Sequence, residues 1–278
     1  MKIELITPRG FCRGVQNALD LLDKALAQGL QPYVLNEIVH NKTIIAAYQQ
    51  KGVIFVKDLQ SVPPHSYIVF SAHGVSPGTR SQAAARKLKI LDATCPLVKK
   101  VHQEAVAYTR QGTHIIYIGH QKHEEAAGVC GEAPQNITLI EKASDIALIP
   151  RGQKQYAVLT QTTLNVKETA RLIAELKKIW PHLREPDKKD ICHATTVRQE
   201  AVQKAAAQVE AIIIIGSQNS SNSARLQETA AAAGCRAYLV DNYRELPPEI
   251  KQYQRIGLTS GASAPEYLVQ ECLEFLQT

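Results

Sequence analysis

Short apolar runs alternate with longer amphipathic stretches along the whole chain of 278 residues. The near-continuous apolar run at 211–215 is typical of a strand that is covered on both faces. Alternation of such runs with helix-length stretches predicts crossover units and parallel sheets. The expected strands cover 3–7, 32–35, 54–56, 67–70, 89–92, 114–118, 137–140, 156–160, 211–215, 236–240 and 255–258. The expected helices cover 15–28, 43–50, 77–88, 97–111, 166–180, 196–208, 221–233 and 264–276.

Polar residues gather directly after five of the expected strands, at 71–74, 119–125, 160–163, 216–223 and 259–263. Ligands bind beyond the carboxyl ends of the strands in open parallel sheets, so we expect these tips to face one cavity. The repeated order of strand, polar tip and helix predicts three similar α/β units of ordinary domain size. We assign the units to 13–95, 96–192 and 193–278, with the strand in 1–12 joining the third.

Three cysteines share one setting, a polar turn between a strand and a helix. They are Cys12, Cys95 and Cys192, and roughly one unit separates each from the next. Three thiolates around a common centre suit a [4Fe–4S] cluster that leaves one iron without a protein ligand. A structural zinc site normally takes four ligands, often paired as C-x₂-C, and the chain has no such pair. The predicted fold is therefore three α/β units with mainly parallel sheets in a pseudo-threefold arrangement around a central cluster. On spacing alone, three unrelated buried thiols remain an equal alternative.

The other cysteines and the composition narrow the class of protein. Cys130, Cys235 and Cys272 lack the shared setting, and the last two fit small packing residues in or beside helices. No stretch reaches the roughly 20 apolar residues of a membrane span, and the N-terminus has no signal-peptide core, so we expect a cytoplasmic protein without membrane contact. The net charge of +6 favours an anionic partner. Scattered charges and 5% aromatic residues argue against nucleic acid and favour a small phosphate ester.

Candidate phosphate ligands lie at the strand tips. The run 220–223 follows a strand and opens a helix, where free N–H groups and the helix dipole attract an anion. An ordinary helix cap is the alternative. Ser263 stands at a second such corner. A single histidine is more often structural than a ligand, but several at equivalent tips favour a site. These histidines are His40, His73, His120 and His123.

Glu125 lies in the same tip as His123. A carboxyl group among phosphate-binding donors can serve as a general acid or base. Thr162, at the next tip, can relay a proton or hold a substrate hydroxyl. A solvated charge in the first turn of a helix is the alternative for Glu125, and Glu124 fits that alternative equally well.

Taken together, these motifs resemble the 4-hydroxy-3-methylbut-2-enyl diphosphate reductase family, which acts last in the methylerythritol phosphate route to isoprenoids. The matching stretches run in order from residue 8 to residue 266. They are P-R-G-F-C-x-G-V (8–15), H-N (40–41), S-A-H-G-V-S-P (71–77), D-A-T-C-P-L-V-x-K-V-H (92–102), G-H-x-x-H (119–123), T-Q-T-T-L (160–164), D-I-C-x-A-T (190–195), S-x-N-S-S-N-S-x-R-L (217–226) and G-A-S-A-P-E (261–266).

The resemblance implies a [4Fe–4S] cluster held by Cys12, Cys95 and Cys192, with Glu125 delivering a proton and Thr162 as its hydroxyl partner. It implies reductive removal of an allylic hydroxyl to give isopentenyl and dimethylallyl diphosphate. The partners it implies are a small diphosphate substrate and a ferredoxin- or flavodoxin-type electron donor. The positions that match the family's diphosphate ligands are His40, His73, His123, Ser220, Ser221, Asn222 and Ser263.

Several positions depart from the family pattern. Glu124 stands where proline is usual and places a second negative charge beside Glu125, and the stretch 126–132 also differs. His193 replaces an aromatic residue, Val197 an asparagine, and Arg13 a small residue beside the first cysteine. Two alternatives therefore stay open. One is a related cluster-dependent reductase of another allylic or diphosphate substrate, and the other is a non-catalytic iron–sulfur sensor or binding module.

Overall fold

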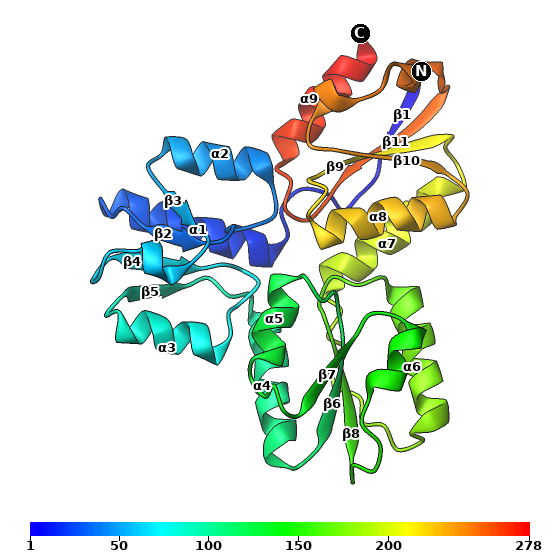
Figure 1. Cartoon of the computed structure of the whole chain (residues 1–278). Coiled ribbons are helices and arrows are strands. Elements are labelled where there is room, and N and C mark those ends of the chain that lie inside the picture. Colours follow the sequence, from blue (N-terminus) through cyan, green and yellow to red (C-terminus); the bar gives the residue numbers. More distant parts are fainter. The chain divides into compact units, whose positions relative to one another are not determined.

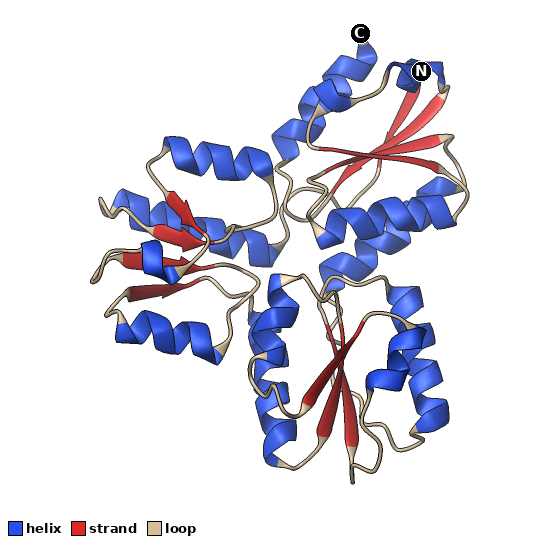
Figure 2. Ribbon diagram, viewed as in Figure 1, coloured by secondary structure: helices blue, strands red, loops and turns tan.

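The computed structural model describes all residues, Met1–Thr278, and strands and helices alternate along them (Figure 2). The strands are β1 (Lys2–Leu5), β2 (Tyr33–Leu35), β3 (Ile54–Val56), β4 (Tyr67–Phe70), β5 (Lys89–Asp92), β6 (His114–Ile118), β7 (Ile137–Ile140), β8 (Tyr156–Thr160), β9 (Ala211–Ile215), β10 (Arg236–Val240) and β11 (Arg255–Ser260). The helices are α1 (Arg13–Ala27), α2 (Lys42–Gln50), α3 (Pro77–Ala85), α4 (Pro96–Arg110), α5 (Glu124–Cys130), α6 (Val166–Ile179), α7 (His193–Ala206), α8 (Ser221–Ala232) and α9 (Glu266–Gln277).

The strands form three separate sheets in which neighbouring strands run parallel. The strand orders are β1-β11-β9-β10, β3-β2-β4-β5 and β7-β6-β8. The chain also divides into two compact units. The first, here the terminal unit, holds the sheet of β1 and comprises Met1–Gln16, Val39–Gln50 and His193–Thr278. The second, here the central unit, holds the other two sheets and comprises Asn17–Ile38 and Lys51–Cys192.

Strand β9 forms the core of the terminal unit. All five of its residues are fully buried, as expected of a strand covered on both faces. Because side chains alternate along a strand, Ile213 packs with α9 on one face, whereas Ile212 packs with α7 and α8 on the other (Figure 1). Both faces are thus closed, and the carboxyl ends of the strands remain as the place where polar residues can gather.

Each sheet of the central unit has its own apolar core. In the first, Ile68 and Phe70 of β4 pack with Ala83 of α3. In the second, Ile116 of β6 packs with Leu172 of α6, and its neighbours Ile115 and Tyr117 pack with α4 and α5 on the opposite face (Figure 1). All three sheets therefore end in polar tips that lie beyond closed cores.

The predicted fold class, three α/β units with parallel sheets, is confirmed. Each expected strand and helix is present, with ends that shift by a few residues. Helix α5 was not among the expected helices, and α7 begins at His193, earlier than the expected 196. No helix combines the length and apolar character that a membrane crossing needs. The unit boundaries, the pseudo-threefold arrangement and the cytoplasmic location stay predictions.

Candidate active site

The three cysteines with the shared setting all stand immediately before a helix. Cys12 precedes α1, Cys95 is the N-cap residue of α4, and Cys192 precedes α7. All three are partly exposed. The positive end of a helix dipole favours the thiolate form of a cysteine, which is the form that binds metal. The amide N–H of Val15 lies 3.4 Å from Cys12 Sγ, which turns that sulfur toward the helix N-terminus.

The backbone repeats one contact at each of these cysteines. The N–H groups of Cys12, Cys95 and Cys192 donate 3.0 Å hydrogen bonds to the carbonyl oxygens of Ala262, Ala72 and Thr162, respectively. Each acceptor lies two positions beyond the last residue of a strand, namely β11, β4 and β8. The sequence predicted that the three cysteines share one setting, and the same backbone hydrogen bond at each of them confirms this.

The remaining three cysteines have a different character. Burial raises the pKa of Cys130 to about 11 and that of Cys272 to about 12, and it also raises the pKa of Cys235. Burial in apolar surroundings keeps such thiols protonated and inert. Cys235 and Cys272 belong to the apolar cores on either side of β9. Among the six cysteines, the three at the helix N-termini thus remain the candidates for binding a metal.

The terminal unit gathers five predicted phosphate ligands at the start of α8. Ser220 is the N-cap residue of that helix, and its Oγ lies 3.5 Å from that of Ser263. Ser263 Oγ donates a 2.9 Å hydrogen bond to the carbonyl oxygen of His40. Asn222 Oδ1 accepts a 2.8 Å hydrogen bond from Ala262 N. Ser221 is the first residue of the helix, so these residues lie around a helix N-terminus, whose dipole favours an anion.

Two glycines permit this close packing. A Cβ atom on Gly216 would lie 2.3 Å from Ser223 Oγ, and one on Gly261 would lie 2.0 Å from the same atom. A side chain at either position would therefore force Ser223 to shift. The glycines therefore set how closely the tips of β9 and β11 approach the helix.

The central unit brings together His73, His123 and both glutamates. The rings of His73 and His123 meet edge to face, with centroids 5.5 Å apart. His73 Nδ1 lies 3.3 Å from Glu124 Oε2 and 3.2 Å from Ser71 Oγ. His123 is the N-cap residue of α5, and its Nδ1 accepts a hydrogen bond from Glu125 N. The residue that replaces the family's usual proline therefore contacts one of the predicted phosphate ligands.

Glu125 is a buried carboxyl group, only 1% exposed, and the solvated alternative weighed from the sequence is wrong for it. Its two oxygens accept hydrogen bonds from Thr162, at 2.7 Å from N and 2.9 Å from Oγ1. Burial raises the pKa of Glu125 from 4.5 to about 7, against the lowering effect of the two Thr162 bonds. A carboxyl group with such a pKa can hold a proton at neutral pH and release it to a reacting group.

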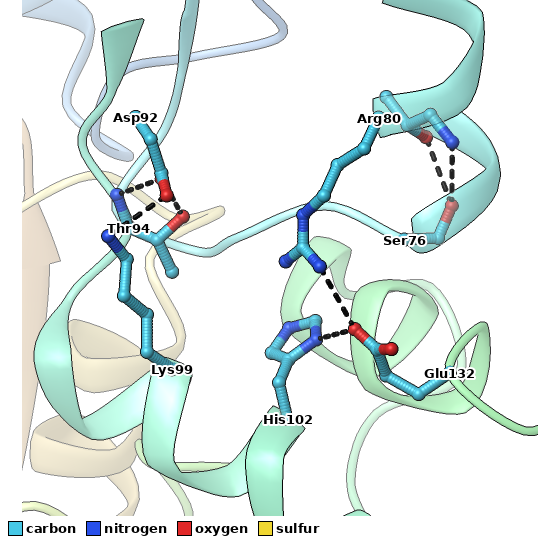
Figure 3. A network of polar contacts seen from close by, with 8 residues as sticks. Ser76, Arg80, Asp92, Thr94, Lys99, His102 and Glu132 are labelled. Carbon is cyan, nitrogen blue, oxygen red and sulfur yellow. Dashed lines mark hydrogen bonds and ion pairs between the residues drawn. The ribbon is translucent and has the colours of Figure 1, made fainter. Parts of the chain in front are cut away.

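Two buried polar networks near these residues were not anticipated. Lys100 of α4 donates to Asp190, whose side chain is fully buried, at 2.8 Å. In Figure 3, His102 and Arg80 both point at Glu132, at 2.6 Å and 3.3 Å. Burial lowers the pKa of His102, although Glu132 opposes this. Lys100 and His102 lie inside the sequence motif at 92–102, which indicated that these residues matter. The motif alone does not show which side chains they contact in the fold.

Comparison with known proteins identifies the family. The family model described as "LytB protein" matches residues 3–277. The chain belongs to the LytB family. A LytB-family relative from Rhodopirellula baltica, named 4-hydroxy-3-methylbut-2-enyl diphosphate reductase, is 47% identical over 100% of this chain and 88% of its own length. One from Ralstonia nicotianae with the same name is 45% identical over 99% of this chain and 86% of its own length. The resemblance inferred from the motifs is confirmed.

Two solved structures of reductases share the fold of this chain. The E-1-hydroxy-2-methyl-but-2-enyl-4-diphosphate reductase from Plasmodium falciparum matches with a TM-score of 0.97 and 35% identity, over 100% of this chain and 88% of that one. A second structure, of the (E)-4-hydroxy-3-methyl-but-2-enyl diphosphate reductase described as the terminal enzyme of the non-mevalonate pathway, matches with a TM-score of 0.69 and 28% identity. It covers 100% of this chain and 99% of its own.

Proposed function

We propose that this LytB-family chain is an iron–sulfur oxidoreductase that converts 4-hydroxy-3-methylbut-2-enyl diphosphate to isopentenyl and dimethylallyl diphosphate. The names of relatives that align with nearly the whole chain carry this proposal. In the reaction the allylic C–O bond breaks, two electrons and two protons enter, and the hydroxyl oxygen leaves as water. The electrons come from a ferredoxin- or flavodoxin-type donor.

Cys12, Cys95 and Cys192 would hold a [4Fe–4S] cluster in which one iron has no protein ligand. Their donor chemistry fits, because each is a partly exposed thiol at the N-terminus of a helix and thiolates are the usual ligands of such clusters, whereas burial raises the pKa of the other three thiols. When bound, such a cluster supplies electrons and a Lewis-acidic iron. The chain's part is to fix the three sulfur atoms through the repeated backbone contact.

The diphosphate tail would bind to the residues that match the family's diphosphate ligands. In the terminal unit these are His40, Ser220, Ser221, Asn222 and Ser263, and in the central unit they are His73 and His123. Support comes from the N-terminus of α8, where a −2 or −3 tail gains from the helix dipole. Hydroxyl and amide groups that are nearly buried, such as those of Ser220 and Asn222, hold an anion in fixed positions.

Glu125 would deliver a proton and Thr162 would keep its carboxyl group in place. A pKa of about 7 leaves Glu125 largely protonated below neutral pH, as a general acid requires. Because both Thr162 bonds are to the carboxylate, they also stabilise the ionised form that remains after proton transfer. Glu124 is partly exposed and faces His73, so it does not share this role.

The experiment is anaerobic purification with iron and sulfide analysis, followed by turnover of the diphosphate with a strong one-electron reductant. We expect one cluster per chain and formation of both products. A cluster without turnover of this substrate would favour a related reductase, and a chain without iron would favour a binding module.

Glu125→Gln and Glu124→Gln form a matched pair for the acid. The first should keep the cluster and lose turnover by at least about 100-fold, since general acid catalysis contributes roughly 10²–10⁴-fold. The second should retain kcat within a few-fold. Equal losses in the two variants would remove the assignment of Glu125.

A further inference from the structure

Arg198 is an arginine of helix α7 that is only 3% exposed and whose guanidinium group binds backbone. Its Nη2 donates a 2.7 Å hydrogen bond to the carbonyl oxygen of Gly10, and its Nη1 donates one of 3.0 Å to that of Ser260. A longer contact of 3.4 Å joins Nη1 to the carbonyl oxygen of Pro8. One side chain thus connects two segments of the terminal unit that are far apart in the sequence.

These segments carry two different parts of the predicted site. Gly10 lies two residues before Cys12, and Ser260 begins the tip that carries Ser263. The segments also bind each other, through Gly10 N to Ser260 Oγ at 2.8 Å and Cys12 N to Ala262 O at 3.0 Å. The guanidinium group adds a further connection, in addition to the 2.7 Å bond from Arg9 Nε to Glu266 Oε1.

The chemistry of arginine suits this task. Its planar fork places two donors at fixed angles, whereas a lysine ammonium is a point donor on a flexible stem. Hydrogen bonds from a charged donor are stronger than neutral ones, and burying the guanidinium group without them would be costly. Loss of the group would leave the carbonyl oxygens of Gly10 and Ser260 without this donor, so the two segments would be less firmly held.

We propose that Arg198 is a positioning residue that holds the Cys12 turn and the Ser263 turn as one rigid piece. Retention of the cluster and binding of the diphosphate then depend on the same side chain. The chemical identity of the two ligands rests on the proposed function.

Arg86 provides a matched control in the central unit. Its Nη2 donates to the carbonyl oxygens of Gln60 and Val62, at 3.2 Å and 2.7 Å, so it makes the same kind of contact at the end of α3 in the other unit. The segment it holds, 60–62, carries no predicted site residue. Arg86→Gln therefore removes a guanidinium–carbonyl clamp without touching either predicted turn.

The test uses anaerobically purified holoprotein of the wild type, Arg198→Gln, Arg198→Lys and Arg86→Gln. The measurements are iron and sulfide per chain, the rate of iron loss to a chelator, and the Kd of inorganic pyrophosphate by calorimetry. We expect Arg198→Gln to lose iron about tenfold faster and to bind pyrophosphate about tenfold more weakly, which is about 1.4 kcal/mol for each. Arg198→Lys should fall between these values and the wild type, and Arg86→Gln should match the wild type.

The proposal is overturned if Arg198→Gln and Arg86→Gln behave alike, or if only one of the two properties changes, because shared support requires both. It is also overturned if neither Arg198 variant folds by circular dichroism, since the residue would then serve the whole fold. A wild-type protein without iron and sulfide would instead refute the proposed function, and pyrophosphate binding would still test the role of Arg198.

Discussion

Burial raises the pKa of Glu125 and the hydroxyl group of Thr162 lowers it, and Thr162→Val tests the contribution of the hydroxyl directly. The substitution removes the 2.9 Å bond from Thr162 Oγ1 but keeps the shape of the side chain and the 2.7 Å bond from its backbone N–H. The lost hydroxyl donates to the ionised carboxylate and lowers the pKa of Glu125. Its removal should therefore raise that pKa above the present value of about 7.

The magnitude follows from the strength of the bond. A hydrogen bond to a charged group contributes about 1.5–3 kcal/mol, and 1.36 kcal/mol corresponds to one pH unit. An acid must be protonated to act, so activity is present below the pKa of Glu125 and falls as the pH rises through it. In Thr162→Val the descending limb of kcat against pH should move to higher pH by about one to two units.

The assay is the pH dependence of kcat and of kcat/KM with the diphosphate substrate under anaerobic conditions. Thr163→Val is the matched control, because Thr163 is the next residue along the chain and its Oγ1 accepts a hydrogen bond from Gln161 Nε2. The control should leave the limb where it is in the wild type. An unmoved limb in Thr162→Val, or one moved to lower pH, would refute the role of the hydroxyl group.

Two further substitutions test the surroundings of the site. Lys100→Met leaves the fully buried carboxylate of Asp190 without its cation and should lower the free energy of unfolding in urea by about 2–4 kcal/mol, whereas an unchanged urea midpoint would contradict this. Gly261→Ala places a Cβ atom 2.0 Å from Ser223 Oγ and should weaken pyrophosphate binding at least about tenfold. Gly78→Ala is the control, because its Cβ atom has ordinary contacts in α3, and this variant should bind pyrophosphate like the wild type.

The sequence predicted the sheets well because periodicity reports burial directly. The strand at 211–215 shows this, since its apolar run has only one structural explanation. Helix α5 was missed because it has seven residues, contains a glycine and begins with two acids, so it gives too little periodic signal. The same helix separates Glu124 from Glu125. The first faces His73 and the second faces Thr162, a difference that depends on the helix phase.

The site was predictable where it lies in short polar motifs and not where it depends on long-range packing. Cys12, Cys95 and Cys192 share local surroundings, so their common setting could be predicted from each turn alone. Arg198 gave no such signal, because an arginine in a helix is usually exposed and its carbonyl partner in Gly10 lies 188 residues away. Only the fold shows that this charge is buried against two turns.

The backbone bond from each of the three cysteines to a carbonyl oxygen has a practical value for mutagenesis. A serine at position 12, 95 or 192 keeps the amide N–H, so the corner stays closed while only the sulfur atom is exchanged. A change in iron content in such a variant can therefore be attributed to the missing sulfur atom rather than to a collapsed loop. Each thiol can therefore be replaced singly while the backbone hydrogen bond of its turn is kept.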